Sequence, residues 1–279
     1  MNARDDLYES LLSSAEADLE AWSRAPASAQ TLSPAYRLAY ADRDFLLRDE
    51  MRGVRLQLEL MKPALELDER GIRSTVVVFG GARIPEPGAE PHRAATPEIG
   101  YRLRQSARYY DTARSFARRA SEVSLASGGC EFVVVSGGGP GIMEAANRGA
   151  ADVGSHSVGL SIVLPHEQLP NAYVTPELCF QFHYFAIRKM HFLMRAKVLA
   201  YFPGGFGTLD ELFEALCLIQ TGKIDRIPIL LFGREFWRKV LNLEALVDEG
   251  TISPEDLELF TYVESAEEGW AEVAEFYEL

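Results

Sequence analysis

Two kinds of residue in this chain could carry out chemistry together: glycines that expose backbone N–H groups, and charged side chains on neighbouring helices. Gly204, Gly205 and Gly207 fall within four positions, directly after an apolar run and just before Thr208. Glycine lets a backbone approach a ligand closely, and N–H groups at a helix start attract an anion. The stretch therefore predicts a strand, a phosphate-binding turn that includes Thr208, and a helix.

Two further glycine turns also follow apolar runs. They are Gly80 and Gly81 in the first turn, and Gly137, Gly138 and Gly139 in the second. Apolar strands that alternate with amphipathic helices predict an α/β fold, a parallel sheet with helices on both faces. Ligands bind such sheets at the carboxyl ends of the strands, where all three turns fall. We therefore expect the three turns to border one site.

Glu211 lies three residues after Thr208, and this spacing allows two roles. The first is a helix capping box, in which the Glu211 side chain would bond back to the Thr208 N–H group. The second is catalytic or binding, because Glu211 would lie one turn into the helix, beside the phosphate turn. The tetrapeptide alone favours the cap.

Arg188, His191 and Arg195 share one face of a predicted helix over residues 184–195 that is otherwise apolar. We expect this helix to be largely buried, and a buried guanidinium needs a carboxylate or phosphate partner. Arg188 is the favoured anion ligand of the three. Asn147, on the helix after the second glycine turn, could reach the site or lie on the surface.

Charge and composition limit the classes of partner. The net charge of −13 disfavours nucleic acid and anionic membrane surfaces, because both select a basic face. Three cysteines without CxxC spacing are expected to be buried free thiols in a reducing, cytoplasmic setting. The histidines form no metal-binding pattern, and no apolar run is long enough to span a bilayer.

The chain divides by pattern into two parts. Residues 1–70 carry apolar residues at helical spacing, over 5–22 and 34–67, and predict a helical N-terminal extension that serves packing or oligomerisation. Residues 71–279 carry the alternating strands and helices. A GxGxxG dinucleotide fingerprint with its acidic partner is not met, so NAD binding is disfavoured. We expect no cofactor and no metal.

The residues now described resemble motifs of a known family. Gly137–Asn147 (GGGPGIMEAAN), the pair Arg188-Lys189, and Pro203–Glu211 (PGGFGTLDE) resemble the LOG family. These are cytokinin riboside 5′-monophosphate phosphoribohydrolases, formerly labelled lysine decarboxylases. The resemblance covers roughly residues 74–276. The motif at Gly137–Asn147 also resembles longer bacterial relatives that cleave purine or pyrimidine monophosphates.

The resemblance implies a Rossmann-like domain that hydrolyses the N-glycosidic bond of a nucleoside 5′-monophosphate to free base and ribose 5-phosphate. It implies a homodimer or higher homo-oligomer. The implied catalytic pair is Arg188 and Glu211. The implied phosphate-binding residues are Gly137, Gly138, Gly139, Gly204, Gly205, Gly207 and Thr208, and possible further contacts are Gly80, Gly81, Lys189 and Asn147.

One departure and two alternatives bear on function. Phe185-Ala-Ile187 stands where compact members carry Met-His, so base preference is not carried over. A molybdenum-cofactor or nucleotide carrier could use the same fold and glycine turns for binding alone. An alarmone-type nucleotide sensor would also bind without turnover. The Arg188 and Glu211 pair favours the hydrolase.

Overall fold

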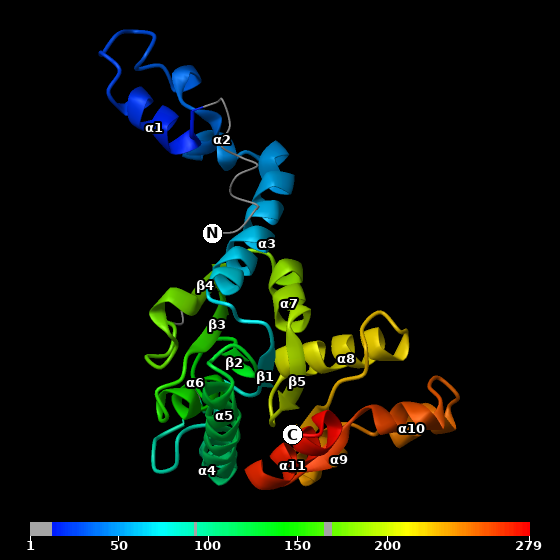
Figure 1. The fold of residues 1–279 in the computed structure, drawn as a ribbon. Coiled ribbons are helices and arrows are strands. Elements are labelled where there is room, and N and C mark those ends of the chain that lie inside the picture. The colour runs from blue at the N-terminus through cyan, green and yellow to red at the C-terminus, as the bar shows by residue number, and fades with distance from the viewer. Residues whose placement is uncertain (1–12, 92–93, 165–168) are drawn as a thin grey trace. The chain divides into compact units, whose positions relative to one another are not determined.

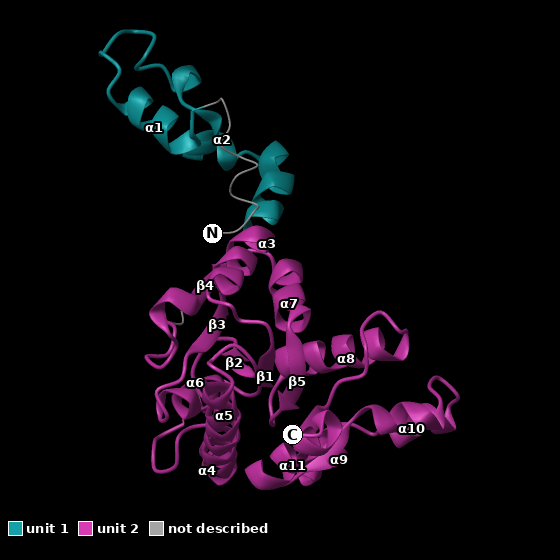
Figure 2. Ribbon diagram, in the orientation of Figure 1, with its two compact units in different colours: residues 1–58 teal, residues 59–279 magenta. Residues whose placement is uncertain are grey.

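The computed structural model describes residues 13–91, 94–164 and 169–279, and the chain forms two compact units, residues 1–58 and 59–279 (Figure 2). The division falls inside helix α3, Arg52–Glu69, whereas the boundary expected from sequence, after residue 70, lies just beyond that helix.

The first unit contains α1 (Ala15–Ser23), α2 (Arg43–Leu46) and the start of α3, with short 3₁₀ turns between them. None of its described residues, 13–58, is buried. The expected long helix over 34–67 is wrong. The Asp42 carboxylate accepts the N–H groups of Asp44 and Phe45 and so begins a separate helix, α2. Residues 5–12 of the other expected helix lie outside the described ranges.

The second unit is built on a seven-stranded sheet in the order β4-β3-β2-β1-β5-β6-β7, and every pairing in it is parallel (Figure 1). The strands are β1 Thr75–Phe79, β2 Val133–Ser136, β3 Ser157–Ile162, β4 Cys179–Phe182, β5 Ala196–Tyr201, β6 Ile229–Phe232 and β7 Thr261–Val263. The chain builds β2 to β4 on one side of β1 and then crosses to place β5 on the other. The expected parallel α/β sheet is confirmed.

Helices cover both faces of this sheet. They are α4 Pro97–Ser106, α5 Arg108–Ala126, α6 Ile142–Ala151, α7 Phe185–Met194, α8 Phe206–Gln220, α9 Arg234–Val240, α10 Glu244–Asp248 and α11 Ala266–Tyr277. One face packs against α5, α6 and α11, and the other against α3, α7, α8 and α9. The single helix expected near residues 235–249 is instead the pair α9 and α10.

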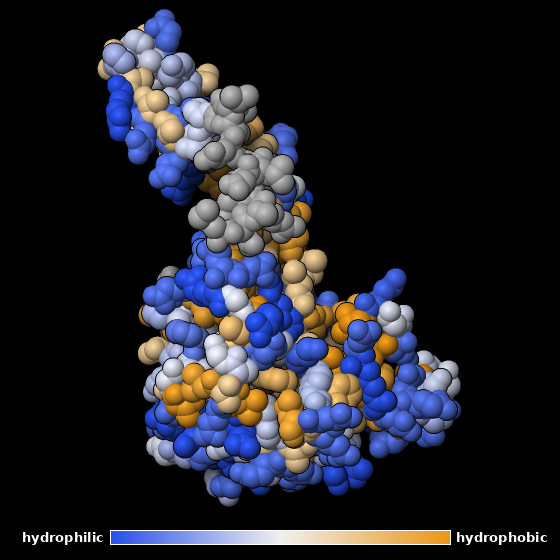
Figure 3. Space-filling view, in the orientation of Figure 1, coloured by the Kyte–Doolittle hydropathy of each residue, from blue (hydrophilic) through white to orange (hydrophobic). Residues whose placement is uncertain are grey.

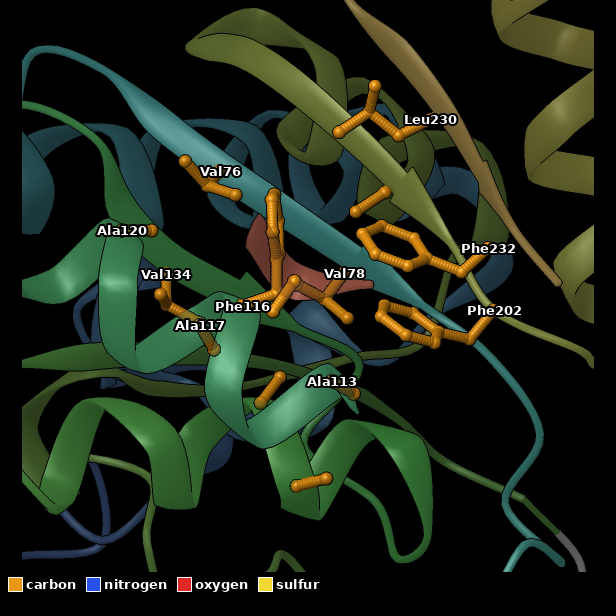
Figure 4. Packing of buried hydrophobic residues seen from close by; sticks show 14 of the residues in the cluster. Val76, Val78, Ala113, Phe116, Ala117, Ala120, Val134, Phe202, Leu230 and Phe232 are labelled. Atoms are coloured by element: carbon orange, nitrogen blue, oxygen red, sulfur yellow. The ribbon is translucent and has the colours of Figure 1, made fainter. Parts of the chain in front are cut away.

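Strand side chains alternate between two buried cores. Val76 and Val78 of β1 enter the core beneath α5, whereas Val77 and Phe79 enter the opposite one. Strand residues that are buried on both sides explain the uninterrupted apolar runs in the sequence. Figure 4 shows the first core, where the rings of Phe202 and Phe232 stack at 4.2 Å beside the α5 side chains.

Two expectations about burial were wrong. Only His191 and Phe192 of α7 are buried, and Met190 and Met194 are about half exposed, because the helix packs on the sheet along one narrow side. The three free cysteines are not buried either, since Cys130 and Cys179 are partly exposed and Cys217 is exposed. Within the described ranges, no helix is long and apolar enough to cross a membrane.

Candidate functional site

A cavity of about 290 Å³ opens at the carboxyl ends of β1, β2, β3 and β5. The chain reverses its direction of sheet building between β1 and β5, and ligands of open α/β sheets bind at such a point. The loops after these strands and the helices α7 and α8 line the cavity. Of the residues expected from sequence, the lining includes Gly80, Gly81, Gly137, Gly138, Gly139, Gly205, Gly207, Thr208, Arg188 and Glu211.

The three glycine turns are tied to one another by backbone hydrogen bonds. The Gly81 N–H donates to the Pro203 carbonyl at 2.9 Å, which joins the first turn to the third. The Ile142 N–H donates to the Gly81 carbonyl at 3.3 Å, which joins the second turn to the first. The floor of the cavity is therefore a connected backbone surface.

Several glycines are needed because another part of the protein occupies the place of a side chain. A Cβ atom on Gly137 would lie 2.7 Å from both Arg188 Nη2 and Met143 Sδ. A Cβ atom on Gly204 would lie 2.1 Å from Thr208 Oγ1, and Gly204 itself is not part of the cavity lining. These glycines shape the turns through packing.

Gly205 and Gly207 differ, because a Cβ atom on either would meet no neighbouring group within 4 Å. Both line the cavity at the start of α8, where the first N–H groups have no partner within the helix. The first turn of α8 contains no acidic residue, so its positive end is not neutralised locally. The space above these two glycines suits a phosphate.

The capping box expected for Thr208 and Glu211 is not formed. Helix α8 begins at Phe206 with Gly205 as its N-cap, so Thr208 is already the third helical residue. The helix begins earlier than the sequence pattern suggested, because the chain turns into it within the glycine stretch. Glu211 is therefore free of the capping role.

Glu211 is 7% exposed and lies on the cavity wall. Burial raises its pKa from 4.5 to about 7, and this effect outweighs the opposing positive charge of Lys189. Within the described ranges, its carboxylate accepts no hydrogen bond, and its charged neighbours act only through space. Such a carboxyl group can gain and lose a proton near neutral pH.

Arg188 reaches the same cavity from α7. Its Nε donates to the Leu160 carbonyl at 2.7 Å, and its guanidinium lies 5.0 Å from the centre of the Phe192 ring. Burial lowers the pKa of Arg188, and the Glu211 charge partly offsets that effect. With Nε engaged and Nη2 against Gly137, the cation is held toward the second glycine turn.

Lys189 and Asn147 do not line the cavity. Lys189 Nζ lies 2.9 Å from Asp210 Oδ2 and 3.1 Å from Glu214 Oε2 on α8, so it binds α7 to α8 beside Glu211. Asn147 is fully buried, and its Oδ1 accepts from Ser136 Oγ at 2.7 Å. Both side chains support the site from behind it.

Asn171 has a role that the sequence did not indicate. Its Nδ2 donates to the carbonyls of Gly138 and Gly139, at 3.1 and 3.0 Å, and to Asn147 Oδ1 at 2.9 Å. This amide pair holds the second glycine turn in shape. An asparagine near prolines has no distinguishing sequence signal.

The remaining wall of the cavity is mostly apolar and was also not predicted. It consists of Val78, Phe79, Ala82, Met143, Ser161, Ile162, Leu164, Leu169, Phe185 and Phe192, together with the charged Asp210. Apolar and aromatic walls with few polar groups are typical of sites for flat organic ligands. Among the described residues, no group of three or more His, Cys, Asp or Glu side chains is placed to hold a metal ion.

Fold and site together define a Rossmann-like α/β protein with a glycine-rich turn at a helix start, a partly buried arginine and a buried carboxylate at the switch point of its sheet. The family model described as possible lysine decarboxylase matches residues 143–273. Cytokinin riboside 5′-monophosphate phosphoribohydrolase LOG3 of Arabidopsis thaliana is 27% identical over 139 residues, 49% of this chain and 63% of that protein. LOG7 of the same plant is 32% identical over 127 residues, 44% of this chain and 56% of that protein.

Over the matched part, the chain is similar to these LOG phosphoribohydrolases. It matches less than two thirds of the length of these curated relatives. Among solved structures, the molybdenum cofactor carrier protein of Chlamydomonas reinhardtii is similar at 18% identity and a TM-score of 0.45, over 74% of this chain and 99% of that one.

Proposed function

We propose that this protein hydrolyses the N-glycosidic bond of a nucleoside 5′-monophosphate and releases free base and ribose 5-phosphate. The observation that carries the proposal is the meeting of an open anion-binding helix start with a buried, unpaired carboxylate, Glu211, in one cavity. The LOG relatives, named as phosphoribohydrolases, support it. A site that only bound phosphate would have no need of a buried carboxylate beside it.

The 5′-phosphate binds at the N–H groups of the third glycine turn, where Gly205 and Gly207 leave room for it. The Arg188 guanidinium adds positive charge from the side of the second turn. When the phosphate is held at this glycine turn, the attached sugar lies toward Glu211, because the turn and Glu211 line the same cavity. Positioning of this kind contributes much of the rate enhancement in such reactions.

Glu211 acts on the sugar. Cleavage passes through a sugar cation with oxocarbenium character, which the Glu211 carboxylate stabilises while it orients the attacking water. The water oxygen bonds to the anomeric carbon as the bond to the base nitrogen breaks, and the proton of water ends on the released base. The apolar wall that includes Phe185 and Leu169 receives the base.

A panel of nucleoside 5′-monophosphates, assayed by chromatography for base and for ribose 5-phosphate, tests this function. We expect equal amounts of the two products from at least one substrate, and little cleavage of the nucleoside without phosphate. Glu211→Gln and Arg188→Ala should each lower kcat/KM by about 100-fold or more, as removal of one transition-state contact does.

Glu275→Gln, on the exposed side of α11, is the matched control and should keep full activity. Tight binding of a nucleotide with no release of base would contradict the hydrolase and would instead support a carrier or a sensor. Full activity of Glu211→Gln would overturn the mechanism while leaving the reaction itself in place.

We also propose that the protein forms a homodimer or higher homo-oligomer, as the family resemblance suggests. Exposed apolar side chains on α7 and α8 support this: Phe206, at the start of α8, is 92% exposed, and Phe185 and Phe213 are also exposed. Figure 3 shows hydrophobic residues grouped over α8 on a mostly hydrophilic surface. Sedimentation velocity should give a multiple of the single-chain mass, and a monomer at micromolar concentration would contradict the proposal.

A further inference from the structure

Helix α7, which carries Arg188, is weakly anchored by its own residues. It is ten residues long, and only His191 and Phe192 are buried. Its N-cap residue, Tyr184, makes no side-chain capping hydrogen bond. A short helix with so little buried surface needs other contacts to fix its position and rotation.

Helix α3 supplies the missing cap. The Glu59 carboxylate accepts the His183 N–H group at Oε1, at 2.9 Å, and the Tyr184 N–H group at Oε2, at 3.1 Å. A negative charge at this end also complements the helix dipole of α7. Both carboxylate oxygens of Glu59 therefore accept backbone N–H groups at the start of α7.

The same segment of α3 contacts α7 farther along. His191 Nε2 lies 3.1 Å from the Glu59 carbonyl oxygen. At the other end of α7, Arg195 Nη2 donates to the Ala64 carbonyl at 3.2 Å and to Asp68 Oδ1 at 2.6 Å. These contacts all lie within the unit of residues 59–279. Together they hold α7, from its first residues to its last, against α3.

Arg188 lies one turn after the capped residues. Its N–H group donates to the Tyr184 carbonyl at 3.1 Å. Tyr184, whose own N–H group donates to Glu59, therefore also begins the turn that carries Arg188. The Arg188 Nε must still reach the Leu160 carbonyl at 2.7 Å for the guanidinium to face the cavity. A small shift or rotation of the first turn would break that contact.

We propose that Glu59 is a positioning residue for Arg188: by capping α7 from α3, it sets the orientation of the guanidinium in the cavity. The inference rests on the proposed function only where turnover is measured. The capping itself and the binding of a phosphate ligand do not depend on that function. Glu59 touches no part of the cavity.

The test compares Glu59→Ala, Glu59→Gln and the control Glu66→Ala in the full-length protein. Glu66 lies on the same helix but pairs with Arg70, the residue just after the helix ends. Glutamine keeps one acceptor oxygen and so should retain part of the cap. Three measurements are made on each variant: amide exchange of residues 183–188, affinity for ribose 5-phosphate, and turnover of a nucleoside monophosphate.

We expect Glu59→Ala to exchange the His183 and Tyr184 amides about 10-fold faster or more, as loss of a helix cap does. It should also lower ribose 5-phosphate affinity and kcat/KM by about 10- to 100-fold, because small displacements of a binding group are costly. Glu59→Gln should recover part of each loss, and Glu66→Ala should match the wild type.

A double-mutant cycle separates positioning from a general structural role. In an Arg188→Ala background, Glu59→Ala should cause no further loss of ribose 5-phosphate affinity, because the residue that it positions is gone. Independent losses that multiply would overturn the proposal, as would unchanged amide exchange in Glu59→Ala. Faster exchange with unchanged ligand affinity would also overturn it.

If the wild-type protein shows no turnover, the proposed function fails, but the exchange and affinity measurements still decide the role of Glu59. If the wild-type protein shows turnover and both Glu59 variants behave like the Glu66→Ala control, the inference fails and the proposed function stands. The two failures are therefore distinguishable.

Discussion

Glu211 sits among four charged side chains that affect its pKa in opposite directions. Burial is the largest influence and raises the pKa to about 7, whereas the charge of Lys189, and to a lesser extent that of Arg188, lowers it. Glu214 and Asp210 raise it. Lys189 forms ion pairs with both Asp210 and Glu214. A change at Lys189 therefore affects all of the charges that act on the pKa of Glu211 from α8.

This arrangement predicts the pH dependence of activity. If the Glu211 carboxylate stabilises the sugar cation, kcat/KM should rise with pH between about 6 and 8, with a midpoint near 7. Lys189→Met removes a positive charge that holds this pKa down, so the midpoint should move to higher pH. Lys189→Arg, which keeps the charge, is the control.

The phosphate of the substrate also titrates near pH 6, but its contribution is the same for every variant. A midpoint that does not move in Lys189→Met, or that moves downward, would show that Glu211 is not the group that limits activity at low pH.

The same pKa predicts a gain in stability for Glu211→Gln. Because burial raises the pKa of Glu211 from 4.5 to about 7, the protonated group favours folding below pH 4.5, and this benefit is lost as the pH rises through 7. The neutral amide avoids that loss. At about 1.4 kcal/mol per pKa unit, the gain at pH 8 is at most about 3.5 kcal/mol.

Urea denaturation at pH 8 and at pH 4 measures this effect. The free energy of unfolding should increase for Glu211→Gln at pH 8 and change little at pH 4. A loss of stability at pH 8 would mean that the carboxylate makes a stabilising contact when ionised.

At the scale of elements, the start of α8 combines helix formation with ligand binding. Gly207 is the second residue of α8, where alanine normally stabilises a helix by up to about 1 kcal/mol. Its position also faces open space in the cavity. The absence of a side chain there is therefore unexplained by packing and is consistent with room for a ligand.

Gly207→Ala should separate these two effects. We expect its melting temperature to stay the same or rise, while ribose 5-phosphate affinity falls about 10-fold or more, because the new methyl group enters the ligand space. Calorimetry measures both quantities. Gly53→Ala, on α3 with nothing within 4 Å and outside the cavity, is the matched glycine control. Unchanged affinity in Gly207→Ala would place the phosphate elsewhere.

At the scale of the whole molecule, the buried core lies entirely in the second unit. No described residue between 13 and 58 is buried, and both hydrophobic clusters draw only on residues from Leu67 onward. The stability of the chain should therefore depend on residues 59–279.

Removing residues 1–51, which leaves all of α3 in place, tests this dependence. The shortened chain should unfold cooperatively, with a melting temperature within about 4 °C of the full-length value, a shift that corresponds to at most about 1–2 kcal/mol in a chain of this size. Thermal denaturation followed by circular dichroism measures it. A larger loss would show that the first unit adds buried contacts to the second.

Much of the sheet could be predicted from the sequence because its signals are local. Residues 76–79 and 198–202 are buried on both faces, so they are hydrophobic at every position, and glycine turns follow them. The shared cavity followed from the rule that parallel strands end on one side of the sheet. Arg188 and Glu211 could be named as candidates for the same reason, together with their family motifs.

The boundaries and supports of the site could not be predicted. Helix α8 begins within the glycine stretch, with Gly205 as its N-cap, so the expected capping box at Thr208 is absent. The exposure of α7 depends on which side of the helix meets the sheet. A sequence pattern that is apolar all round does not show this.

The parallel sheet, the three glycine turns and the candidate pair Arg188 and Glu211 could thus be inferred from local sequence, because strand burial and turn conformation leave marks within a few residues. The burial of Glu211 beside the Lys189 charge, the support of the second turn by Asn171 and the capping of α7 by Glu59 depend on contacts between distant segments. Glu59 and His183 are 124 residues apart in the chain, and no local pattern records a hydrogen bond between such distant segments.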